Sequence, residues 1–339
     1  MWFNNKGKDQ SVAVSTRVRL ARNLTGYAFP SKLDDEKTAE LILKIKSVFE
    51  GKEGWESVDM ASLKTADKAA MLEKHIISRE FAERKGPSLL IKNEEKSVYI
   101  MVPEEDHLRI QCVVAGLDLA EAQERAFDAE KIIDEAYEIA FDERLGYITH
   151  CPTNVGTGMR ASVMLHLPAY TAAGGIRNLS VQLSKIGMTI RGMNGEGSLP
   201  SANLYQISNE VTLGLTEEET LAKLNEAVGK IAAKEWELRE KNDPLHRENN
   251  TDRAMRDIGI LLYAKKLNAG ELISMYSDMR LSASMKDIDI PVELLDEMFF
   301  STMPNTLIAE NEEAKSSAVR DKMRVERVRE ILGRAGHKR

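Results

Sequence analysis

A chain of 339 residues, 42% apolar and 30% charged, is long enough for one large domain or two modest domains with a real core. Its net charge of −7 argues against a nucleic-acid-coating or membrane-surface protein, and no apolar run reaches the roughly eighteen residues of a membrane helix. The N-terminal segment lacks the apolar stretch of a signal peptide, and two cysteines are too few for a disulfide framework or a zinc site, so we expect a cytoplasmic protein.

The first predicted element is a strand over residues 12–20, where polar and apolar side chains alternate. The polar face of this strand carries Ser15, Arg17 and Arg19. The opposite face carries Val14, Val18 and Leu20. Two arginines on one strand face are rarely buried without anions to meet them, so this strand is a candidate part of a binding site.

A helix over residues 34–50, opened by two aspartates, is the next predicted element. Residues 97–102 and 108–114 are two β-rich runs separated by five residues. This spacing predicts an antiparallel hairpin, and the tip over residues 103–107 is strongly acidic.

Helices and strands alternate through the middle of the chain. Helices are predicted over residues 119–143 and 169–186, and strands over residues 146–151, 188–191 and 204–207. Between them, a turn-rich segment at 152–158 leads into an apolar strand through Met164 and Leu167, and the glycine-rich residues 192–201 form a loop. Thr216 and Glu219 form a capping box that opens a long helix to about Glu240.

The clearest domain boundary is at Asp243 and Pro244, which precede a polar run over residues 246–252. Residues 252–339 are predicted helical and hold seven of the fifteen methionines, including Met275, Met279, Met285 and Met298. Such a module is typical of a core or of a packing surface between chains, so we predict a homodimer through it. The predicted fold class is α+β: an antiparallel β-sheet flanked by helices in residues 1–243, followed by an all-helical module in residues 244–339.

Five arginines lie on or beside predicted strand ends: Arg17, Arg19, Arg109, Arg160 and Arg191. Each of them alone could form a salt bridge on an exposed sheet face. As a set they could hold a polyphosphate, because a guanidinium binds phosphate oxygens bidentately and stays charged at neutral pH. The chain has no G-x-x-x-x-G-K-[ST] loop, so a phosphate site would be built from such side chains.

Carboxylates form a second group. Glu104, Glu105 and Asp106 share the hairpin tip, and Glu196 lies in the glycine-rich loop. A charge run of this kind is often only a solvated surface. With a cationic substrate such as a guanidinium, a carboxylate could instead align one nitrogen and accept its proton during transfer.

Four segments carry a family resemblance: S-T-R-V-R at 15–19, E-E-D-H-L-R at 104–109, C-P-T-N-V-G-T-G-M-R at 151–160 and R-G-M-N-G-E at 191–196. In order and spacing they resemble the ATP:guanidino phosphotransferase family, which comprises the phosphagen kinases and their bacterial relatives. The resemblance implies ATP and Mg²⁺ as cofactors and phosphorylation of a guanidinium group.

By position, the resemblance implies roles for individual residues. The five arginines would clamp the nucleotide phosphates, with Arg109, Arg160 and Arg191 also catalytic. Beside the clamp would lie Ser15, Thr16, Val18, Ala161, Ser162, Val163, Met164, Gly192, Met193, Asn194 and Gly195, with His75 at the nucleotide base. Glu105 and Glu196 would bind the substrate guanidinium, with Glu105 as the base, Cys151 nearby, and Glu104 and Asp106 helping to place Mg²⁺ through water.

Within the family, the chain resembles the bacterial protein-arginine kinases. The first arginine strand starts near residue 12, so we expect this chain to lack the N-terminal helical domain of the phosphagen kinases. The resemblance implies protein substrates with exposed or unfolded arginines, marked for an ATP-dependent unfoldase and protease, with an activator protein as a further partner. A phosphagen kinase acting on free arginine or a similar compound is the alternative.

A last motif lies near the C-terminus. Arg320, Asp321, Arg324 and Val325 resemble the R-D-x-x-R-A motif of the protein-arginine kinases, which binds phosphoarginine and regulates activity. Two features depart from the relatives: valine replaces the alanine of this motif, and Pro103 stands in the hairpin tip where asparagine is common. A charged helix face is the alternative explanation for the motif.

Overall fold

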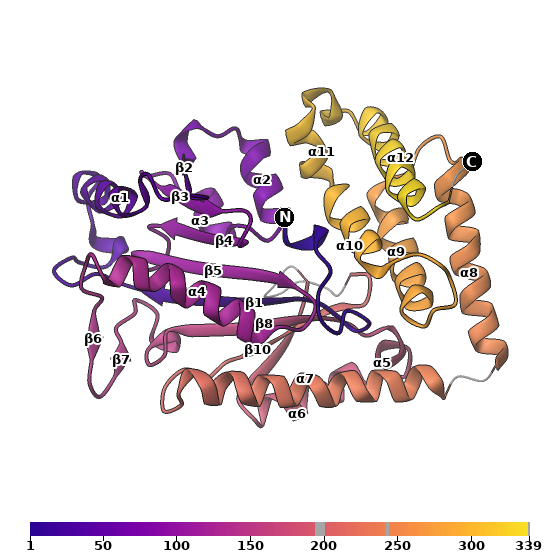
Figure 1. The fold of residues 1–339 in the computed structure, drawn as a ribbon, viewed down its shortest axis with the longest axis horizontal. Helices are drawn as coiled ribbons and strands as arrows, with labels where there is room; N and C mark the ends of the chain where they lie inside the picture. The colour runs from indigo at the N-terminus through magenta and orange to yellow at the C-terminus, as the bar shows by residue number, and fades with distance from the viewer. Residues whose placement is uncertain (194–200, 242–243, 338–339) are drawn as a thin grey trace.

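The computed structural model describes residues 1–193, 201–241 and 244–337, which form an antiparallel sheet and a set of helices (Figure 1). The sheet has eight strands in the order β2-β3-β4-β5-β1-β8-β10-β9. Their bounds are β1 Ala13–Arg22, β2 Glu56–Asp59, β3 Leu89–Asn93, β4 Val98–Val102, β5 Leu108–Ala115, β8 Met159–His166, β9 Met188–Gly192 and β10 Leu204–Asn209. A separate ribbon pairs β6 Phe141–Asp142 with β7 Gly146–Tyr147. The α+β prediction is confirmed.

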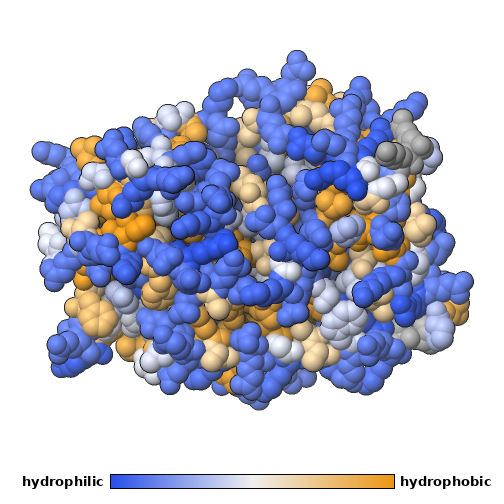
Figure 2. All heavy atoms as spheres, in the orientation of Figure 1, coloured by the Kyte–Doolittle hydropathy of each residue, from blue (hydrophilic) through white to orange (hydrophobic). Residues whose placement is uncertain are grey.

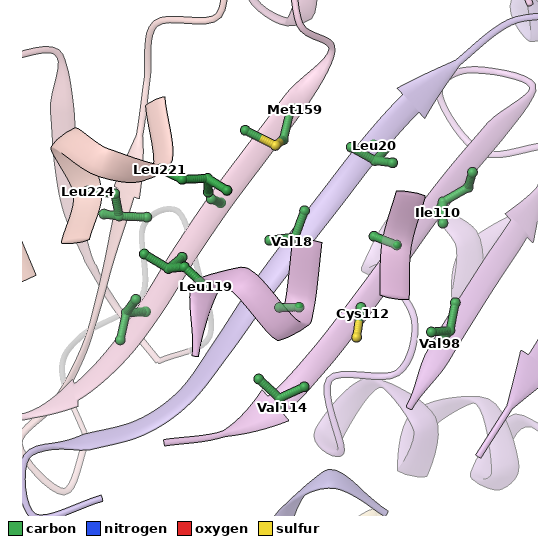
Figure 3. Close-up of a cluster of buried hydrophobic side chains, with 14 of the residues drawn as sticks. Val18, Leu20, Val98, Ile110, Cys112, Val114, Leu119, Met159, Leu221 and Leu224 are labelled. Carbon is green, nitrogen blue, oxygen red and sulfur yellow. The ribbon is translucent and has the colours of Figure 1, made fainter. Parts of the chain in front are cut away.

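One face of the sheet holds the larger hydrophobic core. Helices α1 Asp35–Phe49, α4 Leu119–Asp134, α6 Ile176–Ser184 and α7 Glu217–Glu240 pack on it. Val18 and Leu20 of β1 point into this core, together with Ile110 and Cys112 of β5 (Figure 3). The predicted caps hold, since Asp34 accepts a hydrogen bond at the start of α1 and Thr216 forms the capping box of α7. The apolar half of the strand alternation therefore faces a closed, helix-covered layer.

Within the described part of the chain, the opposite face of the sheet is covered at its two ends. Helices α2 Thr65–Glu73 and α3 Arg79–Glu83 close one end, where Leu90, Tyr99 and Met101 are buried with Phe81. The C-terminal helices close the other end over Val113 and Met164. Between the two covers lies the stretch of sheet that carries the arginines.

The C-terminal helices are α8 Pro244–Tyr263, α9 Ala269–Ser284, α10 Val292–Ser301, α11 Pro304–Glu310 and α12 Ser317–Arg334. Their core contains Met279 and Met298, which are fully buried, as the interpretation of a methionine-rich core requires. The same core includes Trp2, Phe3 and sheet residues, so the helical module and the sheet are packed together rather than separated by a linker. The division at residue 243 stays a prediction, because residues 242–243 lie outside the described part of the chain.

Five sequence-based expectations need correction. The helix predicted over residues 119–143 ends at Asp134, and the helix predicted over 169–186 is split into α5 Pro168–Ala172 and α6, because Gly174 adopts a positive φ of 67°. The strand predicted over 146–151 is only the two-residue β7. The polar run at 246–252 is already part of α8. Val14 lies in the core under the C-terminal helices and not with Val18 and Leu20, because a register shift between Ala13 and Ser15 turns its side chain to the other face.

The surface drawn in Figure 2 is mostly hydrophilic, with apolar patches scattered between charged side chains. Among the described helices, none combines the length and the apolar composition needed to cross a membrane.

Candidate functional site

Four of the five predicted arginines project from neighbouring strands onto the same sheet face. In the register, Arg19 of β1 lies directly opposite Arg160 of β8 and is flanked on β5 by Gln111. Arg17 lies one pleat away on the same face as Arg19, and Arg109 is two residues before Gln111. Like charges placed opposite each other on a sheet are destabilising unless something negative lies between them.

The charge interactions among these arginines confirm that they are close. Burial, followed by the neighbouring charges of Arg17, Arg109 and Arg160, holds the pKa of Arg19 well below its usual value. Burial and then Arg109 lower the pKa of Arg17 to about 10. The pKa of Arg160 is lowered by burial and then by Arg191, which places the fifth arginine beside this cluster.

Several side-chain nitrogens in the cluster are buried without a hydrogen-bond partner. The Nε atoms of Arg17 and Arg19 and the Nε2 atom of His75 have no hydrogen-bond partner among the described residues. Burial and then Arg17 lower the pKa of His75 to about 3, so its ring is neutral at neutral pH. Buried donors without partners are costly, and a bound anion with many acceptor oxygens would satisfy them. The site therefore fits a polyphosphate ligand.

Gln111 of β5 and Phe300 of α10 both contact His75: the first its backbone carbonyl, the second its ring. His75 itself has a positive φ of 58°, and Gln111 Nε2 donates hydrogen bonds to the carbonyl oxygens of His75 (2.7 Å) and Ile76 (2.9 Å). The ring meets Phe300 of α10 edge to face, with 5.9 Å between the ring centres. A helix of the C-terminal module thus contributes to the surroundings of the predicted nucleotide-binding histidine.

The acidic hairpin tip lies at the end of β4 and β5, and its three carboxylates differ. Glu104 is 6% exposed and is bound by Arg109 and by Ser78 Oγ, whose distance to Glu104 Oε1 is 2.6 Å. Asp106 is 2% exposed, and its Oδ1 atom accepts hydrogen bonds from Asn23 Nδ2 and from the His150 amide, both at 2.6 Å. Glu105 between them has an exposed side chain. The solvated-surface explanation therefore applies only to Glu105.

The carboxyl group of Glu105 is suited to accept a proton. Its pKa is raised by burial and then by the negative charges of Asp106 and Glu104, while Arg109 and His150 oppose this shift. His150 Nδ1 lies 4.0 Å from Glu105 Oε1. A carboxyl group with a raised pKa is a better general base than an ordinary surface carboxylate.

The C-P-T-N segment shapes the neighbouring wall. Cys151 Sγ lies 3.0 Å from Thr153 Oγ1, and the Arg160 guanidinium donates to Asn154 Oδ1 and Thr153 Oγ1, both at 3.0 Å. Thr153 and Asn154 therefore orient an arginine of the cluster, a role that the sequence analysis did not give them. Their spacing within the motif was the available signal, because a turn six residues before a strand arginine can fold back on it.

The other predicted nucleotide-site residues divide between the two sheet faces. Ser15, Ser162 and Met164 share the arginine face through the strand register, and Ser162 Oγ accepts a hydrogen bond from Gln206 (2.9 Å). The side chains of Thr16, Val18, Ala161 and Val163 point into the opposite, buried layer, so only their backbone could approach a nucleotide. Gly192 and Met193 follow Arg191, whereas Asn194, Gly195 and Glu196 lie outside the described residues.

A protein-held metal site does not fit these carboxylates. No group of three His, Cys, Asp or Glu side chains within residues 1–193, 201–241 and 244–337 is arranged to hold a metal ion. Both carboxylate oxygens of Glu104 and the Oδ1 atom of Asp106 already accept hydrogen bonds from protein donors. The geometry gives the predicted water-mediated contact of these two residues with Mg²⁺ no support.

The C-terminal motif is largely engaged within the helical module. Arg324 is fully buried and donates to the carbonyls of Thr302 (3.0 Å) and Leu267 (2.7 Å) and to Asp321. Val325 lies in the core. Arg320 donates to the Ala314 carbonyl and is partly exposed, as is Asp321. Among the described side-chain nitrogens and oxygens of these four motif residues, only Arg324 Nη2 is buried without a hydrogen-bond partner. The phosphoarginine pocket therefore stays a prediction.

The comparisons with known proteins identify the family. Residues 37–238 match the family model described as ATP:guanido phosphotransferase, C-terminal catalytic domain, and residues 247–339 match the protein-arginine kinase McsB C-terminal domain. The protein-arginine kinase of Clostridium acetobutylicum is 39% identical over 90% of this chain and 92% of its own length. That of Geobacillus kaustophilus is 36% identical over 98% and 96%.

Solved structures show the same fold in other guanidino kinases. Lombricine kinase superimposes with a TM-score of 0.61 at 24% identity, over 70% of each chain. The duplicated taurocyamine kinase of Schistosoma mansoni gives a TM-score of 0.60 at 27% identity, over 67% of this chain and 33% of its own. The chain therefore belongs to the ATP:guanido phosphotransferase family, on the branch that carries the protein-arginine kinase C-terminal domain.

Proposed function

We propose that this chain is a protein-arginine kinase, which transfers the γ-phosphoryl group of ATP to arginine side chains of proteins. The observation that carries the proposal is the half-buried arginine cluster, in which the Nε atoms of Arg17 and Arg19 are buried without partners, beside a carboxylate of raised pKa. Relatives that share both the sheet and the helical module bear the name protein-arginine kinase. The cluster explains how ATP is held, and Glu105 explains how a guanidinium becomes a nucleophile.

The reaction would proceed by in-line transfer. Arg17, Arg19, Arg109, Arg160 and Arg191 would bind the phosphate oxygens and stabilise negative charge on the transferring group. Glu105, helped by Glu196, would align the substrate guanidinium and accept one proton from the attacking nitrogen. As the new P–N bond forms, the bond between the γ-phosphorus and the bridging oxygen breaks, and ADP leaves.

Mg²⁺ enters the proposal only as the companion of ATP. Bound with ATP, the ion would supply positive charge that offsets the charge of the phosphates, and it would need no dedicated protein cage. This agrees with carboxylates at the tip that are already engaged with protein donors. We therefore assign no step of the reaction to a protein-bound metal.

The proposal extends to partners. The substrates would be cytoplasmic proteins with exposed or unfolded arginines, with an ATP-dependent unfoldase and protease and an activator as further partners. A homodimer through the helical module is also proposed. Helix α8 supports a protein contact there, because it exposes four large apolar residues: Leu245, Met255, Ile260 and Tyr263.

The test of the function offers two substrates to the same enzyme. Purified protein with Mg²⁺ and ATP is incubated with an unfolded arginine-containing protein and, in parallel, with free arginine. Products are read by mass spectrometry at neutral pH, because the P–N bond is acid-labile. Phosphoarginine on the protein alone supports the proposal. Phosphorylation of free arginine alone would instead make the chain a phosphagen kinase.

The first prediction concerns the base. Glu105→Gln keeps the shape of the side chain but cannot accept the proton, so we expect transfer to fall about 10²- to 10⁴-fold while the Kd for ATP changes little. Glu95→Gln, on the exposed turn at the other end of the hairpin, is the matched control. Near-normal transfer by Glu105→Gln would show that another group is the base.

A further inference from the structure

The acidic tip is held on both sides of Glu105, and one of the two anchors is an amide outside the family motifs of the sequence analysis. Asn23 follows directly after β1 and is 3% exposed. We propose that Asn23 is a positioning residue for the base: its side chain ties the tip to the segment that leads into Cys151. This inference rests on the proposed function, because it assumes that Glu105 accepts the proton.

All the hydrogen-bonding capacity of the Asn23 carboxamide nitrogen is directed at these two segments. Asn23 Nδ2 donates to Asp106 Oδ1 at 2.6 Å and to the Ile148 carbonyl at 2.9 Å. Asn23 Oδ1 accepts from the His107 amide at 2.9 Å. Because a primary amide has two N–H donors, both are used, and the carbonyl oxygen is used as well.

These bonds connect three parts of the chain that are far apart in sequence. Asp106 and His107 belong to the hairpin tip, Ile148 lies three residues before Cys151, and Asn23 comes from the end of the strand that carries Arg17 and Arg19. The His150 amide also donates to Asp106 Oδ1. Asp106 is therefore a shared acceptor that joins the tip to the 148–151 segment.

Glu105 lies between two immobilised neighbours. On one side Arg109 and Ser78 hold the Glu104 carboxylate. On the other side Asn23 holds Asp106. Since a displacement of about 1 Å can cost 100-fold in rate, loss of either anchor should reduce catalysis even when the fold survives. Asn23 would thus act through the position of Glu105 and not by touching ATP.

Asn93 is a matched control for Asn23. It is also an asparagine that is 3% exposed, and it also fixes a turn, since its Oδ1 atom accepts from the Lys96 amide at 2.9 Å. That turn joins β3 to β4 at the end of the hairpin opposite to the tip. Asn93→Ala should therefore cost stability, through one lost hydrogen bond where Asn23→Ala loses three, without disturbing Glu105.

The experiment measures kcat, the KM for ATP and the Tm of the full chain for Asn23→Ala and Asn93→Ala, with an unfolded protein as substrate. We expect Asn23→Ala to lower kcat about 30- to 100-fold with the KM for ATP within twofold. Asn93→Ala should lower the Tm but leave kcat within twofold. A kcat of Asn23→Ala that falls no further than that of Asn93→Ala would overturn the proposal. If Asn23→Ala does not fold, Asn23→Ser, whose hydroxyl is too short to reach Asp106, takes its place under the same criterion.

Glu105→Gln separates this inference from the proposed function. If Glu105→Gln retains activity, the base is misassigned and the role of Asn23 falls with it. If Glu105→Gln is inactive but Asn23→Ala is not impaired, only the positioning role fails. In the double variant, Asn23→Ala should add no further loss to that of Glu105→Gln, because Asn23 acts through Glu105. An additional loss of tenfold or more would show that Asn23 acts on something else.

Discussion

Arginines in two regions of the molecule, the sheet–helix junction and the open sheet face, have different surroundings. At the junction between the sheet and the helical module, Arg239 Nε lies 2.7 Å from Glu235 and Arg280 Nε lies 2.8 Å from Asp296, with all four side chains at most 1% exposed. Each arginine also donates to main-chain carbonyls, including His166 for Arg239 and Gln10 for Arg280. On the open sheet face, the Nε atoms of Arg17 and Arg19 lack any such partner among the described residues.

The presence or absence of protein partners separates arginines that stabilise the fold from arginines that are available to bind a ligand. A buried ion pair with its hydrogen bonds satisfied is self-contained, whereas a desolvated guanidinium beside other guanidiniums is unfavourable until an anion arrives. The sheet cluster would therefore gain its stabilising partner only when ATP binds, and the junction arginines would be indifferent to ATP. The contrast can be tested by substituting one arginine of either region.

The largest expected effect is at Arg19, which faces Arg160 across the register. Arg19→Ala should lower kcat/KM for ATP about 10²- to 10³-fold, because a charge that stabilises the transferring phosphoryl group is lost. In the absence of ATP its Tm should be unchanged or higher, because repulsion among the arginines is relieved. Steady-state kinetics and thermal unfolding of the same preparation check both parts. A Tm far below that of the wild type would contradict the comparison.

Arg280 should show the opposite pattern. Arg280→Ala leaves Asp296 buried with Tyr276 as its remaining side-chain donor, and it should destabilise the fold by roughly 3–5 kcal/mol. Urea unfolding measures this loss, and the ATP affinity of the folded fraction should stay within about twofold. Lys230→Ala, which removes an exposed ion pair with Glu226 on α7, is the control and should change the free energy of unfolding little, because solvent screens this pair. An effect of Arg280→Ala no larger than that of Lys230→Ala would break the comparison.

The sequence could not separate these two kinds of arginine by itself. Local patterns were sufficient for the hairpin of β4 and β5, for the cap at Thr216 and for the alternation that sets Arg17 and Arg19 on one face. The family motifs then supplied the ligand. Arg239 and Arg280 each contact a carboxylate and main-chain carbonyls. Among those carbonyls, His166 and Gln10 lie more than seventy residues away along the chain, and no local pattern reports such contacts.

The same limit explains the other misses. Asn23 is a single polar residue after a strand, and its partners Asp106 and Ile148 are 83 and 125 residues further along the chain. Val14 was placed on the wrong face because strict alternation assumes a regular strand, and the register shift at Ala13 and Ser15 is set by pairing with β8. Helical spacing beyond Asp134 was overridden by the pairing of β6 with β7. At these positions, contacts between residues far apart in the sequence therefore determine the structure, and local patterns do not report them.

The smallest expected effect concerns a buried carboxyl group that lacks a hydrogen-bond partner but, unlike the arginines, needs no ligand. Asp257 of α8 is 9% exposed, and its Oδ2 atom has no hydrogen-bond partner within the described structure. Burial and then the charge of Asp278 raise its pKa to about 6, against the opposing effect of Arg253 and Arg256. A buried carboxyl group becomes neutral by keeping its proton, which lowers the cost of its burial. An arginine stays charged at neutral pH and has no such route.

The sign of the pH dependence follows from this pKa. Between the unfolded value of 3.8 and about 6, the folded protein keeps a proton that the unfolded chain has lost, so Asp257 costs stability as the pH rises through this window. Asp257→Asn removes that cost and should raise the Tm by about 2–4 °C at pH 7.5 but not at pH 4. Asp252→Asn, at an exposed site on the same helix, should not raise it at either pH. If Asp257→Asn raises the Tm equally at both pH values, the ionisation of Asp257 is not the cause. The contrast between a carboxyl group that becomes neutral and arginines that need an anion would then fail at this site.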